Sequence, residues 1–178
     1  MLDEELGDRA TKLLDLCKGK NLTVATAESC TGGLLAAALT NIAGSSAVID
    51  RGFVTYTNEA KQQMLGVPPI TIERHGAVSR ETAEAMAAGV LAHAQVDLAV
   101  SVTGIAGPTG ATAGKPIGLV YFGAAARNGR AIHRERRFGD IGRTEVRRKS
   151  VLEAIAMLTE LAEQENAKPA RGAAQARP

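Results

Sequence analysis

The sequence is poor in aromatic residues, and its charges nearly cancel. It has three phenylalanines, two tyrosines and no tryptophan among 178 residues, so we expect no surface that stacks the bases of a single strand. Lysine and arginine total 21 and aspartate and glutamate 19, which gives a formal net charge of +2. A protein that coats nucleic acid carries a much larger positive charge. We therefore expect no nucleic-acid partner.

The sequence also lacks the apolar runs of membrane and exported proteins. No stretch approaches the ~20 apolar residues of a membrane span. The acidic segment 1–8 has neither the basic nor the apolar region of a signal peptide. Two cysteines, Cys17 and Cys30, are too few for a disulfide framework. These absences predict a protein of the reducing cytoplasm that does not associate with membranes.

Familiar metal-binding and nucleotide-binding motifs are missing too. The histidines at 75, 93 and 133 are far apart, and no C-x-x-C or H-E-x-x-H pair occurs, so we expect no metal site and no cofactor. Segment 110–116 (GATAGKP) resembles a P-loop, but it has three residues between its glycines where a P-loop has four. Proline also replaces the Ser or Thr that binds Mg²⁺.

What the sequence does contain is an alternation of helix and strand patterns. Apolar residues at helical spacing predict helices over 3–19, 34–39, 58–65, 79–94 and around 151–162. Short apolar runs predict strands over 22–27, 47–56, 96–103, 117–126 and 131–138, the last two joined by an Asn-Gly hairpin turn. This order predicts a single α/β domain over 1–165, with three α/β/α layers and a mixed sheet. Segment 166–178 is predicted to be a disordered tail.

Three polar or glycine-rich loops follow predicted strands: 27–33, 56–61 and 103–116. In open α/β sheets, ligands bind outside the carboxyl ends of the strands. In the first loop, Ser29 lies at a strand–helix corner beside Thr31, Gly32 and Gly33. The backbone N–H groups of such a corner can hold an oxyanion or a phosphate. A serine or threonine that merely caps the helix is an equally good interpretation.

The second loop places Tyr56 at a strand end and Lys61 one turn into a helix. The helix dipole disfavours a positive charge on a lysine at this position. A lysine that acts as a base must be neutral, so the position suits a base. A solvated surface lysine is the simpler alternative. In the third loop, Thr103, Gly104 and Gly107 follow a buried strand, which indicates a close approach to a ligand, with a plain flexible loop as the alternative.

Basic residues gather where the last helix begins. Arg143 precedes two further arginines and a lysine within 147–149. Positive charge at a helix start opposes the dipole, so an anion or an acidic partner would account for it. A solvated basic face explains it equally simply, and both interpretations stay open.

Five segments, taken together and in order, resemble the CinA C-terminal domain family, whose active members are PncC-type nicotinamide-nucleotide amidohydrolases. They are 26–33 (TAESCTGG), 52–61 (GFVTYTNEAK), 76–79 (GAVS), 102–108 (VTGIAGP) and 115–118 (KPIG). The similarity runs from about residue 5 to 163 and matches the stand-alone form, without the extra N-terminal domain of longer members. One departure is Thr109 with Ala111, where relatives often have glycines.

The resemblance implies the three-layer mixed-sheet fold and hydrolysis of the carboxamide of nicotinamide mononucleotide, which releases ammonia. It implies Ser29 as the nucleophile, activated by Lys61 together with Tyr56. Thr103 and the glycine loop behind it would line the site, and that loop or Arg143 would take the substrate phosphate.

Two other functions remain open at this point. One is a nucleotide-binding or regulatory module with the same pocket and no turnover. The other is a partner-binding protein that uses the basic start of the last helix and the tail. For the amidohydrolase and for the nucleotide-binding module, the expected partner is a small-molecule nucleotide. The sequence also allows a homo-oligomer.

Overall fold

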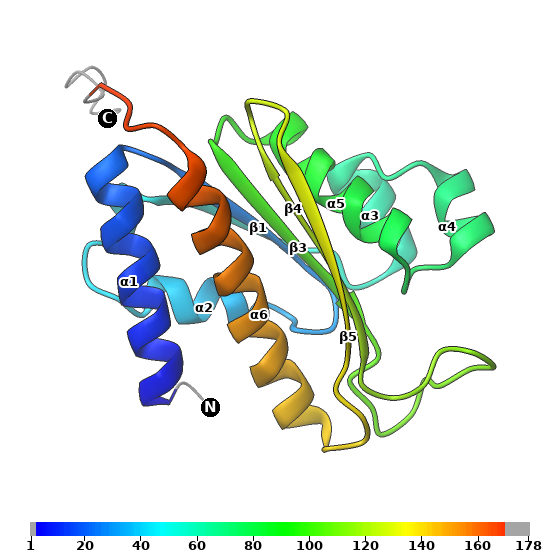
Figure 1. Ribbon diagram of the computed structural model, residues 1–178. Coiled ribbons are helices and arrows are strands. Elements are labelled where there is room, and N and C mark those ends of the chain that lie inside the picture. Colours follow the sequence, from blue (N-terminus) through cyan, green and yellow to red (C-terminus); the bar gives the residue numbers. More distant parts are fainter. Residues whose placement is uncertain (1–2, 170–178) are drawn as a thin grey trace.

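The computed structural model describes residues 3–169, which fold into three layers (Figure 1). The central layer is a five-stranded sheet of β1 (Val24–Glu28), β2 (Ile49–Val54), β3 (Leu98–Gly104), β4 (Leu119–Ala126) and β5 (Ala131–Arg137). One face is covered by α1 (Glu4–Lys20), α2 (Leu34–Thr40) and α6 (Arg143–Gln164). The other carries α5 (Arg80–His93), against which α3 (Asn58–Leu65) and α4 (Pro69–His75) pack. A short 3₁₀ turn, Ser45–Ala47, precedes β2.

The strand order is β2-β1-β3-β4-β5. The pairs β1–β2 and β1–β3 are parallel, whereas β3–β4 and β4–β5 are antiparallel. This confirms the predicted three-layer α/β fold with a mixed sheet. The carboxyl ends of β1, β2 and β3 consequently meet at one edge of the sheet, where the three loops emerge. None of the helices between residues 3 and 169 combines the length and apolar character needed to span a bilayer.

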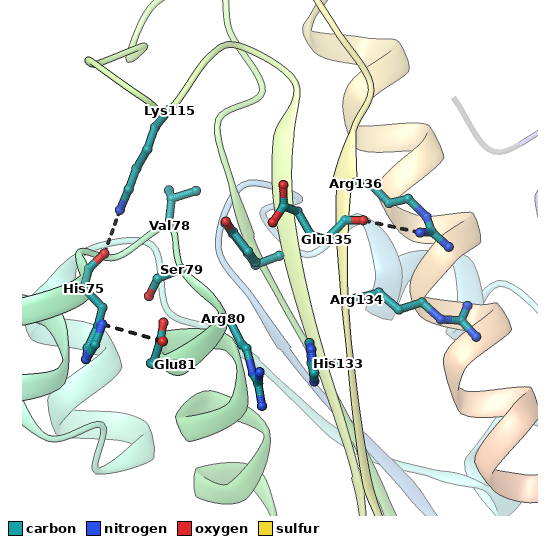
Figure 2. A pocket seen from close by; sticks show the side chains of 11 residues that line it. His75, Val78, Ser79, Arg80, Glu81, Lys115, His133, Arg134, Glu135 and Arg136 are labelled. Atoms are coloured by element: carbon teal, nitrogen blue, oxygen red, sulfur yellow. Dashed lines mark hydrogen bonds and ion pairs between the residues drawn. The ribbon is translucent and has the colours of Figure 1, made fainter.

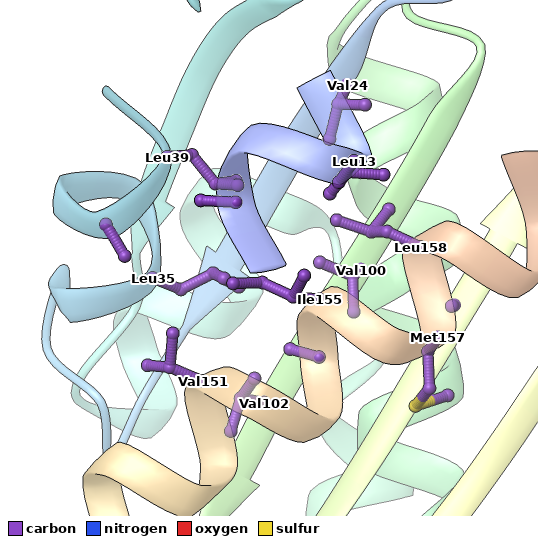
Figure 3. Packing of buried hydrophobic residues seen from close by; sticks show 14 of the residues in the cluster. Leu13, Val24, Leu35, Leu39, Val100, Val102, Val151, Ile155, Met157 and Leu158 are labelled. Carbon is purple, nitrogen blue, oxygen red and sulfur yellow. The ribbon is translucent and has the colours of Figure 1, made fainter. Parts of the chain in front are cut away.

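The larger part of the core lies between the sheet and the α1–α2–α6 layer (Figure 3). Leu13 of α1, Leu35 of α2 and Ile155 of α6 converge there on Val100 of β3, and all four side chains are buried. Burying one such side chain stabilises the fold by roughly 1.5–3 kcal/mol. On the other face α5 packs so closely on β4 that a Cβ at Gly123 would lie 2.5 Å from the carbonyl oxygen of Ala83.

The structure differs from the sequence prediction in one helix, α4. Helix α4 was not expected, because Pro68 and Pro69 indicate a break in the chain. In the structure Pro69 is the first residue of α4, where proline fits because that N–H has no helical partner. Helix α3 is capped by Thr57, whose hydroxyl accepts a 3.1 Å bond from the amide of Ala60, and Asn58 is its first residue.

The start of the predicted disordered tail is anchored in the structure. The Lys168 amide donates to the carbonyl of Lys20 at 2.9 Å, and its own carbonyl accepts from the Asn21 side chain at 2.8 Å. Its ammonium forms an ion pair with the buried Asp97. Lys168 is therefore attached to the domain through its main chain and its side chain, whereas the disordered tail after residue 165 stays a prediction. The rest of the predicted tail, 170–178, lies outside the described residues.

We expect Lys168→Met to lower the melting temperature by about 2–4 °C, which corresponds to a loss of about 1 kcal/mol. The pair involves a buried carboxylate, but the half-exposed ammonium is partly screened by solvent, so the loss is modest. Thermal unfolding would measure it against Lys149→Met, which changes an exposed lysine on α6. Equal melting temperatures for the two variants would show that the anchor contributes nothing to stability.

Candidate active site

A cavity of about 320 Å³ opens at the carboxyl ends of β1, β2 and β3. It is lined by residues of all three predicted loops, by two residues that precede α5, and by the first residue of α6. They are Ser29, Cys30, Tyr56, Asn58, Lys61, Ala77, Val78, Thr103, Gly104, Ile105, Ala106, Gly107, Thr109, Gly110 and Arg143. The structure thus brings Ser29, Tyr56, Lys61, Thr103, Gly104, Gly107 and Arg143 to one place.

Ser29 is the first residue after β1, and its backbone is fixed on both sides. Its amide donates to the carbonyl of Val102 at 2.9 Å, which continues the ladder between β1 and β3. Its carbonyl accepts from the amide of Gly32 at 3.0 Å, which closes a tight turn. The residue is 8% exposed, so its hydroxyl lies at the wall of the cavity and not on the open surface.

Lys61 enters the same cavity from α3 and is 1% exposed. Its Nζ lies 3.1 Å from Ser29 Oγ and 3.0 Å from the carbonyl oxygen of Thr55. The carbonyl oxygens of Tyr56 and Thr57 lie at 3.5 Å. The lysine is therefore not the solvated surface residue that the spacing alone allowed.

The electrostatic environment favours the neutral form of this lysine. Burial lowers the pKa of Lys61 below the 10.5 of an ordinary lysine, while the nearby Cys30 and Glu59 act in the opposite direction. In the part of the chain that the structure describes, no carboxylate forms an ion pair with Lys61. Burial is thus the principal cause of the lowered pKa of Lys61, whereas the sequence suggested the helix dipole.

Cys30, the neighbour of Ser29, is a poor nucleophile. Burial is the largest effect on its thiol and raises the pKa to about 12. The thiolate, which is the reactive form, is therefore scarce at neutral pH. Of the two adjacent side chains, the serine is the one that is hydrogen-bonded to Lys61 and the better candidate nucleophile.

Tyr56 and Arg143 meet at the mouth of the cavity. One guanidinium nitrogen of Arg143 donates to the Tyr56 hydroxyl at 3.1 Å, and another donates to the carbonyl of Gly107 at 3.0 Å. Tyr56 is 58% exposed, and only its backbone carbonyl faces Lys61. Its hydroxyl consequently lies with the arginine and not with the lysine that the resemblance paired it with.

Thr103 and Gly104 shape the inner wall. The Thr103 hydroxyl donates to the carbonyl of Ala77 at 2.8 Å and so holds segment 76–79 against the cavity. A Cβ at Gly104 would lie 2.8 Å from the carbonyl oxygen of Leu119, so the chain passes too close to β4 for a side chain. Segment 76–79 is one of the five segments that resemble the family. The sequence does not predict that it lines the site, but Ala77 and Val78 do.

Thr31, Gly32 and Gly33 are not among the residues that line the cavity. The amide of Gly33 donates to the Glu28 carboxylate at 3.0 Å, and the amides of Leu35 and Ala36 donate to it at 3.0 and 2.8 Å. These N–H groups at the start of α2 already have an acceptor, so they are not open to an anion as the sequence suggested. In the sequence, the sign of this arrangement is the carboxylate of Glu28 ahead of α2, because a negative charge near a helix start is stabilised by the free N–H groups there.

A second, larger cavity of about 560 Å³ lies beside the first and shares Val78 with it. Figure 2 shows Lys115 on one side of it, pointing to the carbonyl of His75, and His75 facing Glu81. Lys115 Nζ lies 2.7 Å from that carbonyl oxygen. Arg134 lies on its rim and pairs with glutamates of α6. Most of its charged groups already form ion pairs, His75 with Glu81 in the lining and the arginines with glutamates outside it. None of the site residues expected from the sequence lines this cavity.

The fold defines an α/β protein with a cavity at the carboxyl ends of its parallel strands, the place where proteins of this class bind their ligands. Within that class, the chain belongs to the CinA C-terminal domain family, whose model matches residues 7–162. The chain is 48% identical over 159 residues to nicotinamide-nucleotide amidohydrolase PncC of Escherichia coli K12, covering 89% of this chain and 95% of that protein. The PncC protein of Enterobacter agglomerans is 50% identical over 138 residues, covering 78% and 84%.

Solved structures agree with this assignment. The competence/damage-inducible protein CihA of Agrobacterium tumefaciens is 53% identical and superposes with a TM-score of 0.89, covering 90% of this chain and 98% of that one. The family expected from the five segments is therefore confirmed.

Proposed function

We propose that this protein is an amidohydrolase that converts nicotinamide mononucleotide to nicotinate mononucleotide and ammonia. Its family membership supports this, because curated relatives about half identical in sequence are named nicotinamide-nucleotide amidohydrolases. The observation that carries the proposal is the pair formed by Ser29 Oγ and Lys61 Nζ, 3.1 Å apart at the wall of the cavity. Amide hydrolysis needs a nucleophile and a base at hydrogen-bond distance, and this pair supplies both.

In the first step, Ser29 Oγ attacks the carboxamide carbon, and Lys61 takes the hydroxyl proton. A neutral lysine amine has two N–H donors and one lone pair. The carbonyl of Thr55 at 3.0 Å and one of the two carbonyls at 3.5 Å accept from the N–H groups. The lone pair is then left for the Ser29 hydroxyl. The backbone carbonyls thus orient the base.

In the second step, the tetrahedral intermediate collapses, the C–N bond breaks, and the Lys61 ammonium gives its proton to the departing nitrogen. Ammonia leaves, and an ester joins the nicotinoyl group to Ser29. Water then attacks this ester, again with Lys61 as the base, which releases the carboxylate product and regenerates the serine. A lysine of lowered pKa suits both roles, because it exchanges its proton more readily near neutral pH.

We assign the substrate phosphate to Arg143. Its guanidinium lies at the cavity mouth, bonded only to the neutral acceptors of Tyr56 and Gly107, and within residues 3–169 it has no ion pair with a carboxylate. A guanidinium binds phosphate strongly through parallel N–H bonds. Tyr56 then serves to orient this arginine.

We expect Arg143→Met to raise KM for nicotinamide mononucleotide by about 10–100-fold, because a hydrogen bond to a charged group contributes about 1.5–3 kcal/mol. Nicotinamide riboside, which lacks the phosphate, is the matched control substrate. Its kcat/KM should change little between wild type and variant. A similar loss for both substrates would show that Arg143 does not recognise the phosphate.

The decisive test of the function is ammonia release from nicotinamide mononucleotide by the purified protein, with nicotinate mononucleotide identified in equal amount. A protein that binds the nucleotide without releasing ammonia would be the nucleotide-binding module, and the proposed activity would be wrong.

A further inference from the structure

We propose that Glu28 is a positioning residue for the reaction: its buried carboxylate fixes the turn that presents Ser29 to Lys61. The inference rests on the proposed function, in which Ser29 is the nucleophile. Glu28 is the last residue of β1 and is fully buried, and it does not line the cavity. It therefore acts, on this proposal, through its neighbours and not on the substrate.

The side chain of Glu28 joins the end of β1 to the start of α2. Oε2 accepts from the amides of Gly33 and Leu35, each at 3.0 Å, and Oε1 accepts from the amide of Ala36 at 2.8 Å. The turn between these two anchors is short and contains Ser29. With both ends of the turn held by one carboxylate, the serine has little room to shift along or away from the strand.

The backbone of the same residue reaches the lysine. The carbonyl of Glu28 accepts from the amide of Thr55 at 2.8 Å, and the carbonyl of Thr55 in turn accepts from Lys61 Nζ at 3.0 Å. Residue 28 is thus connected to the nucleophile through its side chain and to the carbonyl that holds the base through its main chain. The 3.1 Å contact of Ser29 with Lys61 depends on both connections.

A carboxylate is the side chain that suits this place. Three N–H groups converge on it, and an ionised carboxylate is an acceptor at both oxygens. Glutamine has nearly the same shape, but its NH₂ group would turn a donor toward at least one backbone N–H. Aspartate keeps the charge but is one methylene shorter, so it cannot span the same gap without moving the turn.

The test compares Glu28→Gln with wild type in steady-state ammonia release and in the rate at which phenylmethanesulfonyl fluoride modifies Ser29. We expect kcat to fall by about 10²-fold, because small misplacements of reacting groups have effects of this size. KM should change little, since Glu28 does not line the cavity, and modification of Ser29 should slow. Leu158→Ala, a core change on α6 outside the cavity, is the control for lost stability alone.

If Glu28 serves stability only, both variants lower the melting temperature and leave the kcat of the folded protein unchanged, which would overturn the proposal. Should Glu28→Gln fail to fold, Glu28→Asp decides the question by the same kcat criterion. Ser29→Ala in the same assay tests the nucleophile separately from the positioning role of Glu28. If that variant is inactive while the Glu28 variants keep full kcat, only the positioning role is wrong. If Ser29→Ala keeps its activity, the nucleophile is wrong.

Discussion

Ser29→Ala is expected to abolish ammonia release from nicotinamide mononucleotide while the protein stays folded. The hydroxyl oxygen forms the bond to the carboxamide carbon, and alanine has no atom to replace it. In serine hydrolases, loss of the nucleophile costs on the order of 10⁶ in kcat. The fold should survive, because the Ser29 side chain contributes one hydrogen bond, and Lys61 keeps the carbonyl of Thr55 as a partner.

Ammonia release and thermal unfolding would be measured together for this variant. Ser150→Ala is the matched control, because it removes a buried serine hydroxyl from α6, where the group bonds only to the carbonyl of Val146. Both variants should melt near the wild-type temperature, and only Ser29→Ala should lose turnover. Near-normal turnover by folded Ser29→Ala would exclude the serine as nucleophile.

The location of the site was predictable because it follows from strand direction. Ser29 and Lys61 follow β1 and β2, and Thr103 lies at the end of β3. Because β2, β1 and β3 are parallel neighbours, these three strand ends meet at one edge of the sheet. Alternating helix and strand patterns are strong enough in this sequence to predict the succession of elements along the chain, although not the order of the strands in the sheet. That the three loops form one site then followed from the rule that α/β sheets bind ligands at the carboxyl ends of their strands.

The roles of individual groups were less predictable, because they depend on rotamers and on burial. Spacing could not show that Lys61 turns inward, nor that the Tyr56 hydroxyl turns outward to Arg143. Glu28 belongs to one of the five family-like segments, but only the structure shows that its carboxylate accepts three hydrogen bonds from the start of α2. Helix α4 was missed because its two prolines suit a helix start and a loop equally well.

Lys61→Met is expected to lower kcat for ammonia release by about 10²–10⁴-fold, the usual contribution of a general base. Methionine has a similar length and no charge, so it fills the buried space without leaving an unpaired ammonium. The melting temperature should fall only slightly, because the carbonyl of Thr55 loses its donor while the unfavourable burial of an ammonium is relieved. KM should change little, since the proposed role of the lysine is proton transfer and not substrate anchoring.

Lys61→Arg separates proton transfer from electrostatic attraction. Arginine keeps the positive charge but does not lose its proton at any working pH. A residue that only attracts the substrate would be replaced well by arginine, whereas a base would not. Wild-type kcat in a folded Lys61→Arg protein would therefore contradict the role of Lys61 as the base.

The pH dependence of the wild type provides an independent measurement of the same proton. Burial disfavours the ammonium, so the pKa of Lys61 in the folded protein lies below 10.5, and the neutral amine is already populated at lower pH than in a free lysine. Because the neutral amine is the active form, kcat/KM should rise with pH through this lowered pKa and level off above it. The residual activity of Lys61→Met should lack that rise. If the rise persists in Lys61→Met, the proton belongs to another group, and the lysine is then a structural partner of Ser29.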